Sequence, residues 1–420
     1  MNTYFLARYL LPLGAVFGLV AAAQAQEAER PLSYSLSQTF TRDSNIFRLG
    51  DSTLLAPQLL NSPLIAPLSA QRADTISRTS LGASYGNTMG TQTFSLNAGL
   101  DFSRYSRNSR LDSTGYSLMG NWYGDLDRAW YAAVNASIQS SRTDFNNQNG
   151  LALNIANTSN LGGKIGYRFS PTWSVFSGLG ATRTRNSADS VSTANTSQAM
   201  VDAGVKYDPG TGLSAELFVQ HRAVSYPNRE SVDLIGNLIA SLVDNSYNTN
   251  QLVGRINYQV TGQSRLSADV GVSDVRFKAY PLRDTTGLVL GLNYRYTYSD
   301  ALELGARINR DLGGDQSSFA SPVQSNRFAL DASWRATGRI SVLSNYSFNS
   351  RKFSADTGAI LGTNQLTSDQ LRTAGITARY ELFRTVNLSA GWLLSSRSAD
   401  AAGLAYRGNT ISLGVDVKLD

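Results

Sequence analysis

Residues 130–139 read Trp-Tyr-Ala-Ala-Val-Asn-Ala-Ser-Ile-Gln. The even-numbered residues of this stretch, from Trp130 to Ile138, are all apolar, whereas the residues between them are mostly polar or small. Alternation with a period of two predicts a β-strand with one apolar and one polar face. The same pattern occurs at 288–297 and 386–395. From Leu32 onward we count about 18 such runs, most of them close to the roughly ten residues of a tilted membrane-spanning strand.

The connections between these runs also alternate. Short turns, such as those at 208–212 and 383–385, are followed by longer polar segments, such as 142–159 and 350–369. This alternation is typical of outer-membrane barrels, whose periplasmic turns are short and whose extracellular loops are long. We therefore expect an all-β fold, a transmembrane antiparallel up-and-down β-barrel of about 18 strands, with 16 as the alternative count. A soluble solenoid or propeller is less favoured, because no repeat of the required period is present.

Aromatic residues of the apolar face fall near the ends of the predicted strands. Two aromatic girdles around an aliphatic band are expected where a barrel meets the two membrane interfaces. The predicted lower girdle contains Tyr85, Trp122, Trp130, Phe169, Trp173, Tyr207, Tyr258, Tyr296, Trp334 and Tyr380, and the predicted upper girdle contains Phe40, Phe102, Phe277, Tyr346 and Phe348.

The first 25 residues have the pattern of a targeting signal. Arg8 precedes an apolar run that ends in Ala23-Gln24-Ala25, which is the pattern of a secretory signal peptide. We expect residues 1–25 to be removed and residues 26–420 to form the barrel, placed in the bacterial outer membrane. The apolar run is too short for a spanning helix.

Composition excludes most catalytic chemistry. The chain of 420 residues has no cysteine and one histidine, His221, which leaves little scope for thiolate or imidazole sites. No G-x-S-x-G elbow or cluster of metal ligands is present, and Glu216 falls on the opposite face from His221. We expect no enzyme activity, no cofactor and no metal. Lys and Arg are not gathered in runs, so nucleic acid is not an expected partner.

The polar face of the predicted strands carries charges of both signs at mid-strand depth. An Arg or Lys facing lipid at the bilayer midplane would cost about 2–4 kcal/mol, whereas a wet lumen accepts it. At about 18 strands the lumen is wide enough to hold water. Each charge can either pair across the lumen and solvate it, or tune selectivity. The predicted lumen-lining residues are Arg78, Lys164, Arg183, Lys206, Arg255, Arg295, Arg307, Arg335, Arg379, Asp202, Glu216, Asp269, Glu303, Asp331, Glu381 and Asp416.

Two long loops are unusually apolar. Thr53–Ser69 is rich in leucine and is interrupted by three prolines, and Ser231–Asp244 has apolar residues at the spacing of a short amphipathic helix. Exposed apolar surface of this size usually finds a partner. We expect these loops either to fold inward and narrow the mouth or to pack on each other above the rim.

The segment after the first strand reads Thr-Arg-Asp-Ser-Asn-Ile-Phe-Arg-Leu, residues 41–49. It resembles a signature near the mature N-terminus of a β-barrel porin family that includes EpsL-type exopolysaccharide proteins. The matching positions are Asp43, Asn45, Phe47 and Arg48. The resemblance implies an outer-membrane conduit for export of an exopolysaccharide. Independently of it, Asp43-Ser44-Asn45 can form an Asx-type turn that leaves Phe47 and Arg48 to anchor the loop at the rim.

The sequence therefore predicts an outer-membrane pore. The resemblance favours polysaccharide export, and the alternatives are a general or substrate-selective uptake porin for small solutes and a barrel that acts through its long loops. The expected partners are outer-membrane lipid and lipopolysaccharide, a polysaccharide substrate and periplasmic export proteins.

Overall fold

The structure is a computed structural model of the 420-residue chain. It describes residues 32–50, 72–145, 153–226, 231–232, 238–239, 246–278, 281, 284–314, 322–353, 367–400 and 404–419. The predicted signal peptide and Thr53–Ser69 lie outside these ranges. Within them, no helix is long and apolar enough to span a bilayer.

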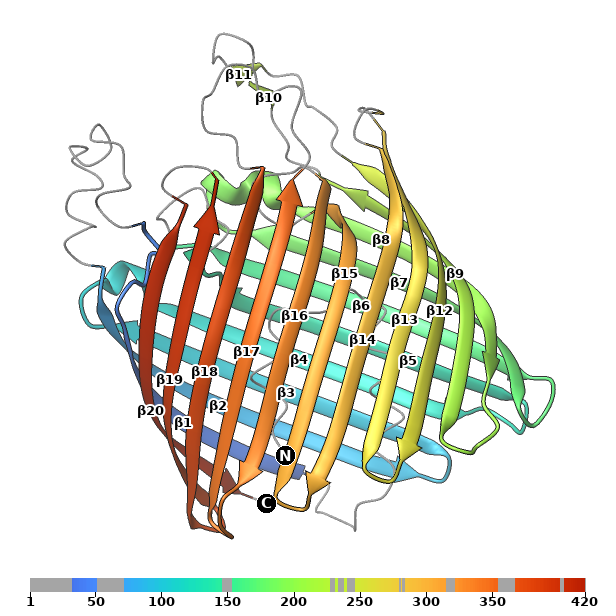
Figure 1. Ribbon diagram of the computed structural model, residues 1–420, viewed down its shortest axis with the longest axis horizontal. Helices are drawn as coiled ribbons and strands as arrows, with labels where there is room; N and C mark the ends of the chain where they lie inside the picture. Colours follow the sequence, from blue (N-terminus) through green and yellow to red (C-terminus); the bar gives the residue numbers. More distant parts are fainter. Residues whose placement is uncertain are drawn as a thin grey trace.

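Eighteen long strands form one antiparallel sheet (Figure 1). The first nine are β1 (Leu32–Asp43), β2 (Asp74–Met89), β3 (Gln92–Tyr105), β4 (Ser113–Asp125), β5 (Trp130–Arg142), β6 (Ile155–Arg168), β7 (Trp173–Asn186), β8 (Thr196–Tyr207) and β9 (Leu213–Ser225). The other nine are β12 (Tyr247–Thr261), β13 (Ser264–Phe277), β14 (Thr285–Ser299), β15 (Leu302–Gly314), β16 (Pro322–Arg335), β17 (Ile340–Phe353), β18 (Ser368–Phe383), β19 (Val386–Ala399) and β20 (Tyr406–Leu419).

The sheet closes on itself. Each strand pairs with its neighbours in the chain, β9 pairs with β12, and β20 pairs with β1, from Tyr34 opposite Leu419 to Asp43 opposite Thr410. Closure gives both edges of every long strand a hydrogen-bonding partner, which is the condition for a sheet that lies in lipid. The prediction of an 18-stranded up-and-down barrel is confirmed, including its first strand at Leu32.

The two ends of the barrel differ in their connections. At the lower end in Figure 1 the strands are joined by short turns, for example Gly90-Thr91 between β2 and β3, where Gly90 has φ +62°. β1 begins and β20 ends at this same end. The longer connections are at the upper end, where two of them contain the 3₁₀ helices η3 (Ser109–Leu111) and η5 (Asp189–Ala194). The arrangement places both ends of the sheet on the side of the short turns, as predicted.

The alternation of the sequence becomes an outward and an inward face. On β7, Trp173 and Leu179 are 43% and 65% exposed on the convex side, whereas Phe176 between them is 6% exposed. The strand register extends this assignment around the barrel, because residues directly opposite each other lie on the same face. The outward rows form an apolar belt, with exposed leucine, valine, isoleucine and aromatic side chains on nearly every strand.

The aromatic girdles follow the register with one exception. Around the lower end, the Trp130 ring packs against Tyr167 and the Trp173 ring against Tyr207, tilted at 51° and 48° with ring centroids 4.9 Å apart in each pair. The predicted upper-girdle residue Phe277 faces inward instead. It is buried in an inward cluster at the upper ends of β9, β12 and β13, so the assignment of Phe277 to the lipid face is wrong.

The prediction of a helix over Ser231–Asp244 is also wrong at the positions that the structure describes. Two short strands, β10 (Ser231–Val232) and β11 (Leu238–Ile239), pair antiparallel there. The sequence between them contains Gly236-Asn237, a dipeptide that favours a turn over a helix.

Candidate functional site: the charged lumen wall

The predicted lumen residues lie on the inward rows with one exception. Arg183 shares the outward row of β7 with Trp173 and Leu179, so its assignment to the lumen is wrong. It lies above the apolar belt, where an outward charge meets water and headgroups and carries no midplane penalty. The residues that the register places inward are Arg78, Lys164, Lys206, Arg255, Arg295, Arg307, Arg335, Arg379, Asp202, Glu216, Asp269, Glu303, Asp331, Glu381 and Asp416.

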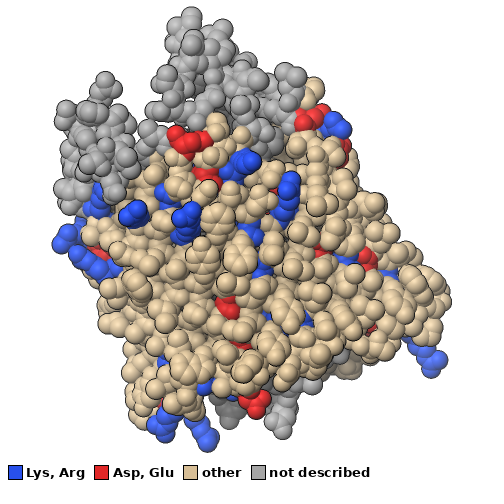
Figure 2. All heavy atoms as spheres, viewed as in Figure 1, with Lys and Arg blue, Asp and Glu red and all other residues tan. Residues whose placement is uncertain are grey.

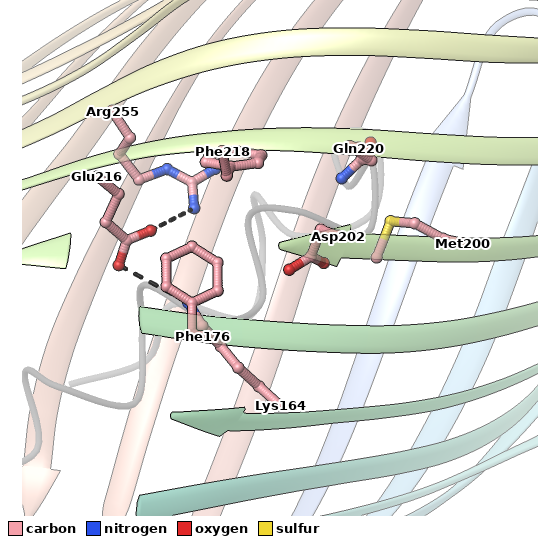
Figure 3. A pocket seen from close by; sticks show the side chains of 8 residues that line it. All are labelled: Lys164, Phe176, Met200, Asp202, Glu216, Phe218, Gln220 and Arg255. Carbon is pink, nitrogen blue, oxygen red and sulfur yellow. Dashed lines mark ion pairs between the residues drawn. The ribbon is translucent and has the colours of Figure 1, made fainter. Parts of the chain in front are cut away.

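Glu216 on β9 is the centre of one cluster of these charges (Figure 3). Its two carboxylate oxygens lie 3.7 Å from Lys164 Nζ on β6 and 3.7 Å from an Arg255 nitrogen on β12. Arg255 also donates through Nε to Asp269 on β13, at 2.7 Å. The charges therefore form a chain along one wall from β6 to β13, in which the contact between Lys164 and Glu216 passes over β7 and β8.

Aromatic rings fill the spaces between these charges. Lys164 Nζ lies 3.6 Å from the centroid of the Phe176 ring, and the Arg255 guanidinium lies 5.2 Å from that of Phe218. Both arrangements allow cation–π attraction. The pocket lined by these residues has a volume of only about 20 Å³, which is room for about one water molecule. The space between these side chains is therefore too small for a solute.

A second cluster surrounds Arg295 on β14. Its guanidinium contacts Glu303 on β15 at 3.0 Å and Asp331 on β16 at 2.9 Å. To reach Asp331 it crosses β15 at Gly305, where an added Cβ would lie 2.5 Å from a carboxylate oxygen of Asp331. Glycine is therefore needed at position 305 for the pair to form across a strand.

Three of the predicted lumen arginines make no ion pair with an acidic residue in the described ranges. They are Arg307 on β15, Arg335 on β16 and Arg379 on β18. Arg335 and Arg379 share one row through Ser341, so their backbones are about 10 Å apart at the usual strand spacing. Lys206 is paired with Asp208 at 2.9 Å, and Arg78 with Asp101 at 2.7 Å. Arg222 on β9 and Arg265 on β13 also face inward without an ion pair in these ranges, as do the acids Glu381 on β18 and Asp416 on β20.

The motif residues anchor the loop that follows β1. Asn45 N–H donates to Asp43 Oδ1 at 2.8 Å, which is the predicted Asx-type turn. Asn45 Nδ2 donates to the carbonyls of Leu49 and Arg407, and so fastens the loop to itself and to β20. Arg48, at φ 55°, is held by an ion pair with Asp43 at 2.8 Å. Burial lowers the pKa of the Arg48 guanidinium, but Asp43 more than offsets this, so the pKa lies above its usual value.

Two apolar clusters line the upper mouth from the inside. Phe47 is 2% exposed and its ring lies 5.1 Å from that of Phe145, in a cluster that also contains Tyr105 and Leu111. The other cluster contains Tyr247 and four further residues of β9, β12, β13 and the loop after β9. These groups of strands lie on nearly opposite sides of the ring. The described loops therefore narrow the mouth at two places.

Sequence reasoning missed the buried charges at the mouth. Asp369 accepts from Arg351 Nε at 2.8 Å and lies 2.7 Å from Arg397, and all three side chains are nearly inaccessible. Their parity on β17, β18 and β19 could have revealed them, because all three fall on the inward face. Arg351 and Asp369 lie in the predicted loop 350–369 and Arg397 lies beyond the predicted run 386–395, so the parity was not followed that far.

The closed sheet, the apolar outer belt and the charged interior together decide the setting of the chain. It is a β-barrel of the bacterial outer membrane. His221 lies outward on β9, bonded to Asn250 at 2.7 Å, and it is separated by the wall from Glu216. Among the described residues no group of acidic, histidine or cysteine side chains could hold a metal ion.

Comparison with known proteins gives likeness in fold alone. No family model and no curated protein matches the chain, so the resemblance to EpsL-type proteins finds no support. Among solved structures, OccK2 (OpdF) of Pseudomonas aeruginosa has a TM-score of 0.47 at 12% identity, covering 94% of this chain and 100% of that one. OpdK of the same organism has a TM-score of 0.45 at 13% identity, covering 92% of this chain and 99% of that one. A BenF-like porin of Pseudomonas fluorescens has a TM-score of 0.47 at 12% identity, covering 93% of this chain and 99% of that one.

Proposed function

We propose that this barrel is a diffusion pore for the uptake of small hydrophilic solutes, with a preference for anionic ones. A circular barrel of 18 strands at about 4.8 Å spacing and about 40° tilt has a backbone diameter of about 36 Å. Side chains of about 6 Å on each wall leave a bore of about 24 Å. The observation that carries the proposal is that Arg307, Arg335 and Arg379 face this bore without an ion pair to an acidic residue in the described ranges.

The mouth favours small solutes over a polymer. The loop held by Phe47 and the cluster around Tyr247 narrow the entrance from two nearly opposite sides. A narrowed entrance hinders a hydrated polymer more than it hinders a monomeric acid. We therefore place uptake before the polysaccharide export that the motif suggested.

The proposal is tested in planar bilayers that contain the purified mature barrel. We expect stepwise conductance and, across a tenfold KCl gradient, a reversal potential on the chloride side. In liposome swelling, a monomeric sugar acid should enter and a polymer of the same sugar acid should be excluded. Absence of conductance or a preference for potassium would refute the pore proposal, and equal entry of the polymer would refute uptake in favour of export.

A further inference from the structure

The outward face of β15–β20 and β1 has an uneven distribution of charge. Figure 2 shows lysine and arginine side chains gathered toward the upper ends of the strands on this side, above a belt with few charges. Each strand has a first polar outward residue above the belt. On β15, β18 and β1 this residue is an arginine, namely Arg310, Arg372 and Arg42, and on β16, β17, β19 and β20 it is uncharged.

One outward residue further toward the upper end of these strands, there are two more cations and no acidic residue. These cations are Lys352 on β17 and Arg407 on β20, both exposed. None of the five cations makes an ion pair within the described part of the chain. Asp400, just beyond the upper end of β19, accepts hydrogen bonds from Thr367 and Ser368.

The lower outward ends of the same strands are different. Trp334, Tyr380, Leu382 and Val417 mark that boundary, and the basic residues there, such as Arg339, lie in the turns beyond the strands. Cations that served only solubility would be expected with acids among them. A one-sided band at the depth of the outer-leaflet headgroups fits a negatively charged lipid surface.

Arg372 and Arg407 form the best-defined part of this band. Ser396 on β19 pairs with Arg372 on β18 and with Arg407 on β20. The three residues therefore form one row, in which the backbones of the two arginines are about 10 Å apart. The Arg372 guanidinium lies 5.6 Å from the centroid of the Phe348 ring, and its Nη2 donates to Gln370 at 3.0 Å. These contacts hold the group at the apolar boundary, and the face of the guanidinium turned away from the ring is left for a ligand. Two guanidinium groups flanking a hydroxyl suit a phosphate group.

We infer that the row Arg372–Ser396–Arg407 binds a phosphate group of lipopolysaccharide in the outer leaflet, with Arg42, Arg310 and Lys352 extending the contact to further phosphates. The inference depends on the membrane orientation of the barrel and is independent of what passes through the lumen.

The test uses the full mature barrel in nanodiscs and purified lipopolysaccharide, with binding followed by native mass spectrometry. We expect Arg372→Gln/Arg407→Gln to weaken binding about thirty-fold, from the contribution of two cations at an anionic lipid surface. The matched control Arg335→Gln/Arg379→Gln removes two arginines from the lumen and should bind as the parent does. Arg372→Lys/Arg407→Lys keeps the charge and should keep most of the affinity, provided that the barrel is folded as judged by its heat-modifiable gel mobility.

Three further probes define the source of the phosphate. Dephosphorylated lipopolysaccharide should bind as weakly to the parent as the intact lipid binds to the glutamine variant. Inorganic phosphate at millimolar concentration should not displace the lipid, and phosphatidylglycerol should bind more weakly. Unchanged affinity in the glutamine variant, equal binding of the dephosphorylated lipid or of phosphatidylglycerol, or displacement by inorganic phosphate would overturn the inference.

Discussion

Reversing the charge of Arg335 and Arg379 should reverse the ionic preference of the pore. Both side chains lie on one inward row without an acidic partner in the described ranges, and the double variant Arg335→Glu/Arg379→Glu changes the wall by four charge units. We take a permeating ion about 10 Å from each side chain. In water at 0.1 M salt, the screened interaction energy between each unit of wall charge and this ion is then about 0.15 kcal/mol.

A change of four charge units therefore changes the energy of a permeating ion by about 0.6 kcal/mol, raising it for anions and lowering it for cations. The chloride-to-potassium permeability ratio should therefore fall by about eight-fold at 0.1 M salt. At 1 M salt the screening length is about 3 Å, and the same variant should change the ratio by only about 1.2-fold. A change in pore width would not depend on salt in this way.

The assay is the reversal potential across a KCl gradient, measured at mean concentrations near 0.1 M and 1 M. Arg183→Glu/Arg185→Glu is the control, because it makes the same change of charge on the outward face of β7. It should leave the reversal potential unchanged. An equal shift in the control, no shift at 0.1 M, or a shift that persists at 1 M would refute the assignment of Arg335 and Arg379 to the lumen wall.

Three further substitutions probe the loop anchor, the lipid face and the close strand contacts. Phe47→Ala leaves a cavity against Phe145 and should make proteolysis of the β1–β2 connection at least tenfold faster in intact vesicles; an unchanged rate would contradict the anchoring role. Leu330→Arg on the outward face should lower the free energy of unfolding in lipid by about 2–4 kcal/mol, whereas Ala329→Arg on the inward face should lower it by less than about 1 kcal/mol, and equal costs would contradict the face assignment. Gly204→Ala places a Cβ 2.5 Å from that of Phe218 and against the Leu217 carbonyl, and should destabilise by about 1–3 kcal/mol in urea titration. Its control Gly254→Ala, whose nearest neighbour is 3.8 Å away, should be nearly neutral, and a similar loss in both would argue against the steric cause.

The fold could be predicted because its rule is local. In a single-layer barrel each residue faces either lipid or lumen, so the parity within one strand, such as 130–139, contains the needed information. Closure of the sheet followed from the need of every backbone group in lipid for an internal partner. The motif turn at Asp43 was predicted for the same reason, since an Asx-type hydrogen bond spans only two residues.

The errors fall where that rule stops applying. Arg183 lies above the belt, where a charge is accepted on either face, so its charge carried no information about direction. Phe277 is apolar yet inward, because the mouth has its own apolar cluster. Which charges pair could not be predicted either: the contact between Arg295 and Asp331 crosses a whole strand and depends on Gly305, a relation that appears only once the register is known.

Alternate residues of one strand contact lipid and lumen water, and the absence of native cysteine makes this alternation directly measurable. Single cysteines are placed at each position from 328 to 333 of β16, and the barrels in liposomes are treated with a charged, membrane-impermeant thiol reagent. We predict rapid labelling at 329, 331 and 333 and protection at 328, 330 and 332. Labelling without a period of two, or protection of 329, 331 and 333 instead, would contradict the account.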